Sequence, residues 1–297
     1  MKNIFWSIYI NIEREVLNLA DMIHFTDNQL SVYSVRVSDL LIRCNVESES
    51  LIRELYKDKF KKVLDQPGQM LLALNHEWSL DKKRVSIIST NMHYSEKYAS
   101  FCPFCYKNNG PDDYYKAYNS IKHDRSNTFE KYANIHFLLR ALGALYILNI
   151  YFRKEEVKNI VGTFQIDRSL GSKIFAFNVV TFRPEFPVRN LTLSGPEELE
   201  AIYVIRPQSG YDEYFKEIEK VFNYYYQILK DFGYKPQIDE NGNELEISYK
   251  ELYRIAARLE KFDVLPKIQS QEPLKKYNDI RYCATLNTTD EIVFYKE

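Results

Sequence analysis

The chain has 297 residues, of which 45% are hydrophobic and 27% are charged, and its formal net charge is −1. This composition is typical of a folded soluble protein and excludes a disordered chain. The near-zero net charge excludes a protein that holds nucleic acid through a global basic field, so any contact with RNA must be local.

The spacing of apolar residues predicts a helical N-terminal half. The helices expected there cover residues 1–23, 30–62 and 69–80. Pro67 and Gly68 predict a turn between the second helix and the third. A strand is expected in "KKRVSIIST" (82–90), followed by a loop over residues 98–113.

Helical character resumes at about residue 113 and is expected to break near 124–127. Asn127 with Glu130 three residues later resembles a capping box, which predicts one long helix from there to about residue 153. This segment is apolar almost all round, but Arg140 interrupts it. We therefore expect a central buried helix and not a membrane span.

After about residue 160 the pattern changes to short β-branched and aromatic runs, which predict strands. The expected strands cover residues 171–182, 200–207, 280–286 and 291–297. An amphipathic helix is expected over 212–234, ended by Gly233. The predicted fold class is α+β, with a mainly helical N-terminal bundle (residues 1–158) followed by a mixed α+β region (159–297).

The four cysteines and the absence of a signal-peptide pattern in the first residues predict free thiols in the cytoplasm. Cys102 and Cys105 have the spacing of a metal knuckle or a redox pair, but the sequence contains no second pair with such spacing. With nine glycines and no phosphate-binding loop motif, nucleotide cradles are not expected either. We therefore expect no metal and no cofactor.

The segment "YNSIKHDRSN" (118–127) holds the candidate catalytic residues. On one helix, Asn119 and His123 lie four residues apart on the same face. Lys122 and Arg125 flank this face, and Lys116 lies one turn before it. A histidine that transfers a proton, an amide that orients it and cations that stabilise a charged phosphorane are sufficient for metal-independent RNA cleavage. The alternative is a charged helix end on a helical scaffold, in which His123 only caps a turn or binds a neighbouring helix.

Two segments of the N-terminal half resemble the HEPN superfamily. These are "VYSVRVSDLLIRCNVESESLIRELY" and "YNSIKHDRSNTFEKYANIHFLLRALGALYIL", and the resemblance covers roughly residues 28–155. The catalytic motif of HEPN nucleases is Arg, a polar residue, three residues and His. Asn119 and His123 match this motif, whereas Tyr118 stands in place of the arginine.

The resemblance implies a helical bundle that forms a homodimer and cleaves RNA in a bacterial defence or toxin system. His123, Arg125, Asn119 and Lys122 would then be catalytic, and Lys116 and Tyr118 would contact the substrate. Without the motif arginine, two alternatives remain. Either Lys122 or Arg125 supplies the positive charge from a shifted position, or the fold is an inactive dimer that binds a protein partner from the same operon or senses a ligand.

Overall fold

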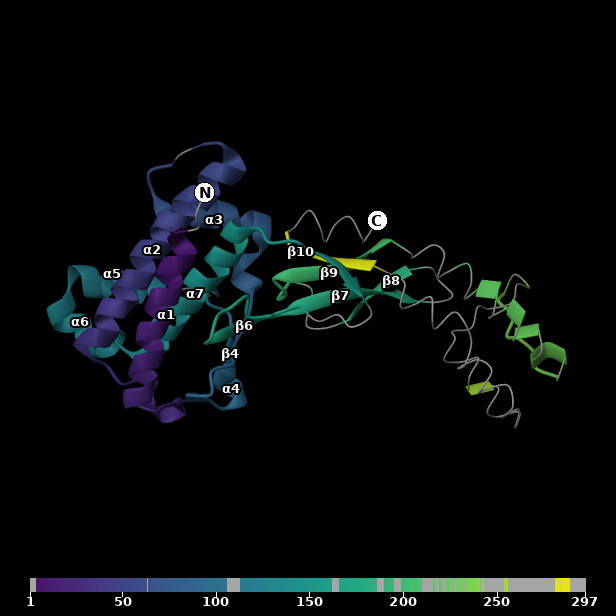
Figure 1. Ribbon diagram of the computed structural model, residues 1–297, viewed down its shortest axis with the longest axis horizontal. Helices are drawn as coiled ribbons and strands as arrows, with labels where there is room; N and C mark the ends of the chain where they lie inside the picture. The colour runs from purple at the N-terminus through teal and green to yellow at the C-terminus, as the bar shows by residue number, and fades with distance from the viewer. Residues whose placement is uncertain are drawn as a thin grey trace.

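The computed structural model describes most of the chain and shows an α+β fold (Figure 1). The described residues are 4–62, 64–105, 113–161, 166–185, 190–194, 199–209 and 281–288, with scattered positions between 216 and 255. Helices gather at one end of the molecule, and the larger sheet extends away from them.

The longer helices of the described residues form the N-terminal part. They are α1 (Ile4–Met22), α2 (Val35–Phe60), α3 (Pro67–Trp78), α5 (Tyr114–His123), α6 (Arg125–Tyr132) and α7 (Ile135–Arg153). The predicted helices over 1–23, 30–62 and 69–80 are confirmed as α1, α2 and α3. The turn predicted at Pro67 and Gly68 is wrong, because Pro67 begins α3. A proline fits this first helical position, where its missing N–H has no intrahelical partner to lose.

The break between α5 and the next helix is confirmed and lies at Asp124. The single long helix predicted after it is wrong: α6 and α7 are separate, and Asn127 lies inside α6. The N-cap of α7 is Asn134, whose side chain accepts the backbone N–H of Phe137 at 3.2 Å. Asn127 instead donates to the Asp124 carboxylate at 2.8 Å. Asn134 is also held in extended geometry by a β-bridge to Tyr33, which explains why it begins the helix.

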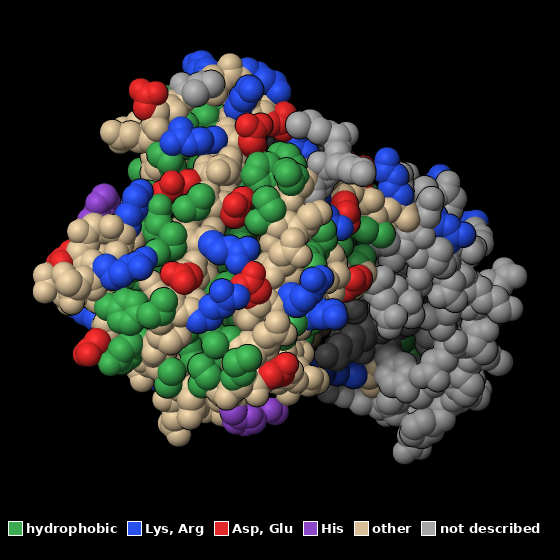
Figure 2. All heavy atoms as spheres, turned by 60° about the vertical axis from the view of Figure 1, so that its left-hand side comes forward, with side chains coloured by type: hydrophobic (Ala, Val, Ile, Leu, Met, Phe, Trp, Pro, Cys, Tyr) green, Lys and Arg blue, Asp and Glu red, His purple; other side chains and the backbone are tan. Residues whose placement is uncertain are grey.

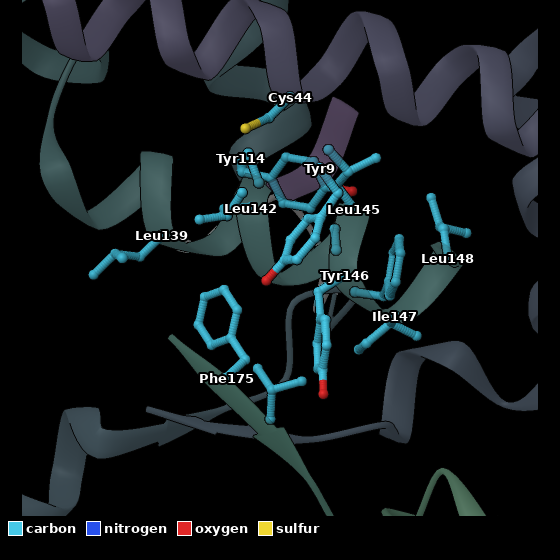
Figure 3. Packing of buried hydrophobic residues seen from close by; sticks show 14 of the residues in the cluster. Tyr9, Cys44, Tyr114, Leu139, Leu142, Leu145, Tyr146, Ile147, Leu148 and Phe175 are labelled. Atoms are coloured by element: carbon cyan, nitrogen blue, oxygen red, sulfur yellow. The ribbon is translucent and has the colours of Figure 1, made fainter. Parts of the chain in front are cut away.

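The core is built around α7, which packs mainly against α2 and also contacts α1 and α5. Buried side chains surround it, including Tyr9 of α1, Cys44 of α2 and Phe175 (Figure 3). By length and composition α7 could cross a membrane, but 83% of its apolar window is buried inside the protein. This burial is typical of the central helix of a soluble fold.

Short strands accompany the helices. Two-residue strands β1 (Phe25–Thr26) and β3 (Met92–His93) pair in parallel, next to the short helices η1 (Asp27–Gln29) and α4 (Glu96–Ala99). Strand β2 (Val85–Ile87) confirms the strand predicted in 82–90 and follows η2 (Leu80–Lys82). It lies between β4 (Ser100–Phe101) and β6 (Phe175–Phe177) in an antiparallel sheet. This sheet therefore joins early and late parts of the chain.

The larger sheet has the strand order β5-β10-β9-β7-β8. Its strands are β5 (Val157–Val161), β7 (Val179–Glu185), β8 (Asn190–Ser194), β9 (Tyr203–Ser209) and β10 (Arg281–Leu286). The predicted strands over 171–182, 200–207 and 280–286 are confirmed, the first as β6 and β7 together. β5 and β8 were not predicted. The strand expected over 291–297 lies outside the described residues.

The described positions between 216 and 231 are helical, in agreement with the helix predicted over 212–234. Gly233 follows it with a φ of +94°, a left-handed conformation that glycine adopts without steric cost. This is the conformation expected at the residue after a helix end.

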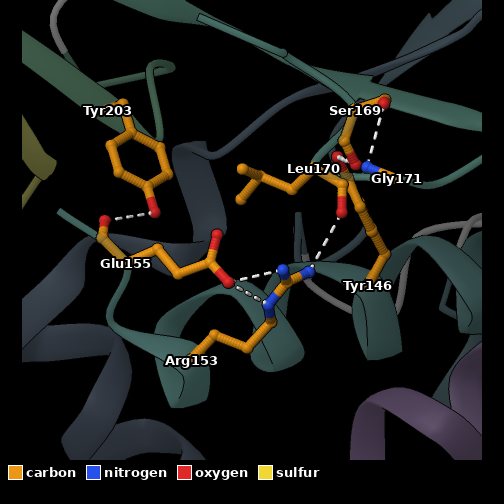
Figure 4. A network of polar contacts seen from close by, with 7 residues as sticks. All are labelled: Tyr146, Arg153, Glu155, Ser169, Leu170, Gly171 and Tyr203. Carbon is orange, nitrogen blue, oxygen red and sulfur yellow. Dashed lines mark hydrogen bonds and ion pairs between the residues drawn. The ribbon is translucent and has the colours of Figure 1, made fainter. Parts of the chain in front are cut away.

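Buried polar contacts tie the helices to the later strands. At the end of α7, Arg153 donates to Glu155 at 2.9 Å and to the carbonyl of Leu170 at 3.0 Å (Figure 4). The Tyr203 hydroxyl donates to the carbonyl of Glu155 at 2.8 Å, and Tyr146 reaches the turn that follows β5. The boundary expected at residue 158 stays a prediction, and contacts of this kind cross it.

Candidate functional site

The residues that the sequence singles out lie at the corner between α5 and α6. His123 is the last residue of α5, Arg125 is the first of α6, and both side chains are exposed. Lys116 and Lys122 are exposed as well. The corner therefore brings four basic or titratable side chains to the surface. None of the hollows described below is lined by His123.

Tyr118, at the position of the motif arginine, is only 2% exposed. Its ring lies under the ammonium group of Lys122, with 5.3 Å between Nζ and the ring centroid. A cation over an aromatic face is a favourable contact, so Lys122 has a structural partner within its own helix. Substrate contact by Tyr118 stays a prediction, and in the folded chain this ring offers almost no surface.

Asn119 is half-buried and hydrogen-bonds the hydroxyl of Tyr115. The same hydroxyl donates to Glu49 of α2 at 3.2 Å, and burial together with this carboxylate raises the pKa of Tyr115. Asn119 and His123 share a helix face, as predicted from their spacing. The amide of Asn119, however, is engaged with Tyr115 within α5, and Tyr115 in turn bonds Glu49 of α2, which gives the amide a structural role.

The charges on this side of the molecule are mixed. Figure 2 shows Lys and Arg side chains interspersed with Asp and Glu over the face that contains the helices, with apolar patches between them. A protein that follows an RNA backbone usually presents a basic stripe. The visible face has no such continuous stripe among the described residues.

A second group of candidate side chains lies at the start of α7, and sequence reasoning missed it. His136 and Arg140 are four residues apart, and the Nε of Arg140 donates to the Nε2 of His136 at 3.1 Å. The guanidinium also donates to the carbonyl of Cys102 at 3.3 Å and lies over the ring of Phe101. The four-residue spacing of His136 and Arg140 can be seen in the sequence, where Arg140 is the cation that interrupts the apolar helix.

This pair lines a small hollow under α4. The hollow is also lined by Leu30, Ile87, Tyr94, Lys97, Tyr98, Phe101 and Leu139. Lys97 lies 4.8 Å from the ring centroid of Tyr98. The Tyr94 hydroxyl is buried and has no hydrogen-bond partner in the structure. We call this group the α7 hollow.

Two other hollows are weaker candidates for a functional site. One lies between α2 and α3 and is mainly apolar, with Leu71, Leu72 and Phe104 in its walls. The other lies where α7 meets β10, under the stacked rings of Trp78 and Tyr151. Its lysines are neutralised by nearby carboxylates: Lys59 pairs with Glu77, and Lys154 pairs with Asp58.

The cysteines are free thiols, and burial raises the pKa of Cys102 to about 12. A thiol with a raised pKa is a poor nucleophile and a poor metal ligand at neutral pH. Within the part of the chain that the structure describes, no cluster of three or more His, Cys, Asp or Glu side chains could hold a metal ion. Comparison with protein-family models, with curated proteins and with solved structures finds no match for this chain.

Proposed function

We propose that this chain is a HEPN-like binding subunit, a cytoplasmic helical protein of a bacterial defence or toxin system that does not cleave RNA by itself. The helical bundle of α1, α2, α5 and α7 is the part that would correspond to the HEPN fold. The observation that carries the proposal is the burial of Tyr118. No cation occupies the position of the motif arginine, and the exposed imidazole of His123 lines none of the hollows described above among the described residues.

The charge pattern and the bond of Asn119 support the same conclusion. Acid–base catalysis needs an imidazole held within hydrogen-bond reach of the reacting atoms. In this chain the neighbouring amide is engaged with Tyr115. A protein partner encoded beside this chain, rather than RNA, would then be its principal ligand.

The test is an RNA cleavage assay with concentrated pure protein. We expect labelled single-stranded RNA to stay intact with the wild-type chain and with His123→Ala. The control is His76→Ala, which removes an exposed histidine at the end of α3. Cleavage that is lost in His123→Ala and kept in His76→Ala would contradict the proposal.

A second candidate is metal-independent RNA cleavage by a homodimer, and one observation favours it. Lys122, His123 and Arg125 are all exposed at one corner, where a second copy could complete the site. The two copies would then double the local positive charge around the phosphate.

Mixing inactive variants tests this dimer directly. If the site is shared, His123→Ala and Arg125→Ala are each inactive, and their mixture regains part of the activity through heterodimers. Light scattering on the same samples gives the oligomeric state. A monomeric protein, or no recovery on mixing an equilibrated dimer, excludes the shared site.

A further inference from the structure

We propose that the α7 hollow binds a small oxyanion, namely a phosphate group, through Arg140, Lys97 and Tyr94. This inference goes beyond the proposed function, because the hollow lies apart from the α5–α6 corner and shares no residue with it. The side chains that line it include the cations Lys97 and Arg140 and no carboxylate, although Asp27 lies near Tyr94 and Lys97.

The first step of the argument is the orientation of Arg140. Its Nε–H donates to the Nε2 of His136 at 3.1 Å. The carbonyl of Cys102 accepts from Nη1, and the ring of Phe101 lies 5.3 Å from the guanidinium carbon. These contacts fix the plane of the guanidinium. A fixed guanidinium is well suited to binding phosphate, since less entropy is lost when the ligand arrives.

The second step is the hydroxyl of Tyr94. Buried polar groups almost always have a hydrogen-bond partner, and an exception calls for an explanation. Burial and the nearby Asp27 raise the pKa of Tyr94, so the hydroxyl stays protonated and can donate. Asp27 itself accepts the backbone N–H of Ser95 at 3.0 Å. An oxyanion in the hollow would supply the acceptor that Tyr94 lacks.

The third step excludes a simpler anion site. The N-terminus of a helix can bind phosphate through its free N–H groups, but those of α7 are already used. The N–H of Ile135 donates to Val32 and that of His136 to Leu30, while Phe137 donates to the Asn134 side chain. The binding groups must therefore be the side chains that line the hollow.

The test is calorimetric titration of the full chain with inorganic phosphate, with adenosine monophosphate and with acetate. We expect the first two to bind and acetate to bind at least tenfold more weakly, because acetate offers fewer oxygens and less charge. Equal affinity for inorganic phosphate and for adenosine monophosphate would identify free phosphate as the ligand of the hollow. Tighter binding of the nucleotide identifies a phosphorylated organic molecule.

Tyr94→Phe is the decisive variant, because it removes a hydroxyl that has no partner in the structure. It should fold with unchanged or higher stability and bind phosphate about tenfold more weakly, as expected for one lost hydrogen bond to a charged group. Lys97→Gln, at an exposed position, should also weaken binding. Tyr115→Phe, on α5, is the control and should bind as the wild type does. If phosphate does not bind at millimolar concentration, or Tyr94→Phe binds it unchanged, the proposal is wrong.

Discussion

At the scale of single residues, two buried charged groups hold distant parts of the chain together. Glu13 is 2% exposed, and its Oε1 accepts from the hydroxyls of Tyr9 and Ser172 and from two backbone N–H groups. Lys83 is 1% exposed and donates to the carbonyl of Ala201 at 2.9 Å. Each has at least one hydrogen-bond partner far away in the sequence, and buried charges need such partners.

Replacing Glu13 by Ala should destabilise the protein strongly. The change removes the carboxylate that Tyr9, Ser172 and the 173–174 backbone share as an acceptor, which we expect to lower the free energy of unfolding by about 3 kcal/mol. Urea denaturation followed by circular dichroism measures this value. Glu54→Ala, at an exposed position of α2, is the control and should change it by less than about 0.5 kcal/mol. Similar values for both variants would contradict the role given to Glu13.

Lys83 should make stability depend on pH. Burial lowers its pKa to about 7 from an ordinary value of 10.5. Between these two pH values the unfolded chain binds a proton that the folded chain does not, so this group makes the protein more stable as pH rises through that window. Below pH 7 the folded chain carries the buried charge, and the contribution is at its least favourable.

The variant Lys83→Met should remove this dependence. Relative to the wild type, it should flatten the rise in the free energy of unfolding between pH 7 and pH 9, by up to about 2 kcal/mol. In this variant the carbonyl of Ala201 keeps one hydrogen-bond donor, because the side-chain amide of Asn287 also donates to it. Denaturant titrations at several pH values give the slopes, with the exposed Lys82→Met as the control. Parallel slopes for the wild type and Lys83→Met would show that Lys83 does not titrate in this range.

At the scale of elements, strand β4 and the residues that follow it pack against α7 at Gly143 through Phe101 and Pro103. A Cβ at this position would lie 3.1 Å from the ring of Phe101 and 3.2 Å from the ring of Pro103. Such distances are shorter than ordinary carbon contacts. The absence of a side chain at Gly143 therefore lets this segment approach, and Phe101 of the same segment lines the α7 hollow.

Gly143→Val should lower the free energy of unfolding by about 2–3 kcal/mol, because the added methyl groups overpack the contact with Phe101 and Pro103. Gly68→Ala is the matched glycine control, since nothing lies within 4 Å of the added Cβ in α3. It should raise stability by about 0.5–1 kcal/mol through its helix propensity. Thermal denaturation of both variants measures these changes in stability. A destabilised Gly68→Ala variant together with a tolerated Gly143→Val variant would contradict the close contact that we describe at Gly143.

At the scale of the whole molecule, tyrosine hydroxyls join the helices to the strands. Tyr146 donates to the carbonyl of Ser169 at 2.8 Å, and Tyr151 donates to that of Asn287 at 2.8 Å. Both rings belong to α7, the most buried helix. We therefore expect the described helices and strands to unfold as one cooperative unit.

Tyr151→Phe tests this cooperativity. It leaves a buried carbonyl without its donor and should cost about 1–2 kcal/mol. Both tryptophans, Trp6 and Trp78, lie in helices, whereas circular dichroism also reports the strands. The unfolding midpoints from fluorescence and from circular dichroism should fall together. Tyr33→Phe, at an exposed position, is the control, and separate midpoints would indicate two independent domains divided near residue 158.

The sequence predicts those features that depend on local pattern. The spacing of apolar residues in α1, α2 and α3 indicates which face of each helix is buried. The ends of these helices could therefore be predicted within a few residues. Strand β5 is short and pairs with β10 from far away in the chain, whereas β8 is short and pairs antiparallel with β7, which directly precedes it. Asn127 and Asn134 have equal capping ability, and the bridge to Tyr33 decides between them.

The same distinction between local sequence pattern and packing of distant segments applies to the candidate sites. The helix that presents Asn119 and His123 could be predicted, whereas the burial of Tyr118 depends on packing against other elements. The spacing of His136 and Arg140 can be seen in the sequence. The hollow beside them cannot, because α4 and the loop before α5 form its other walls.

The bond between Glu13 and Ser172 has a consequence for the protein as it is made. The ribosome releases Glu13 159 residues before Ser172, and Tyr151 136 residues before Asn287. Throughout that interval the nascent first half carries a carboxylate and a tyrosine whose final partners have not been translated. The native bonds of Glu13 and Tyr151 can therefore form only after residues 172 and 287 have left the exit tunnel, and until then these buried groups lack their native partners.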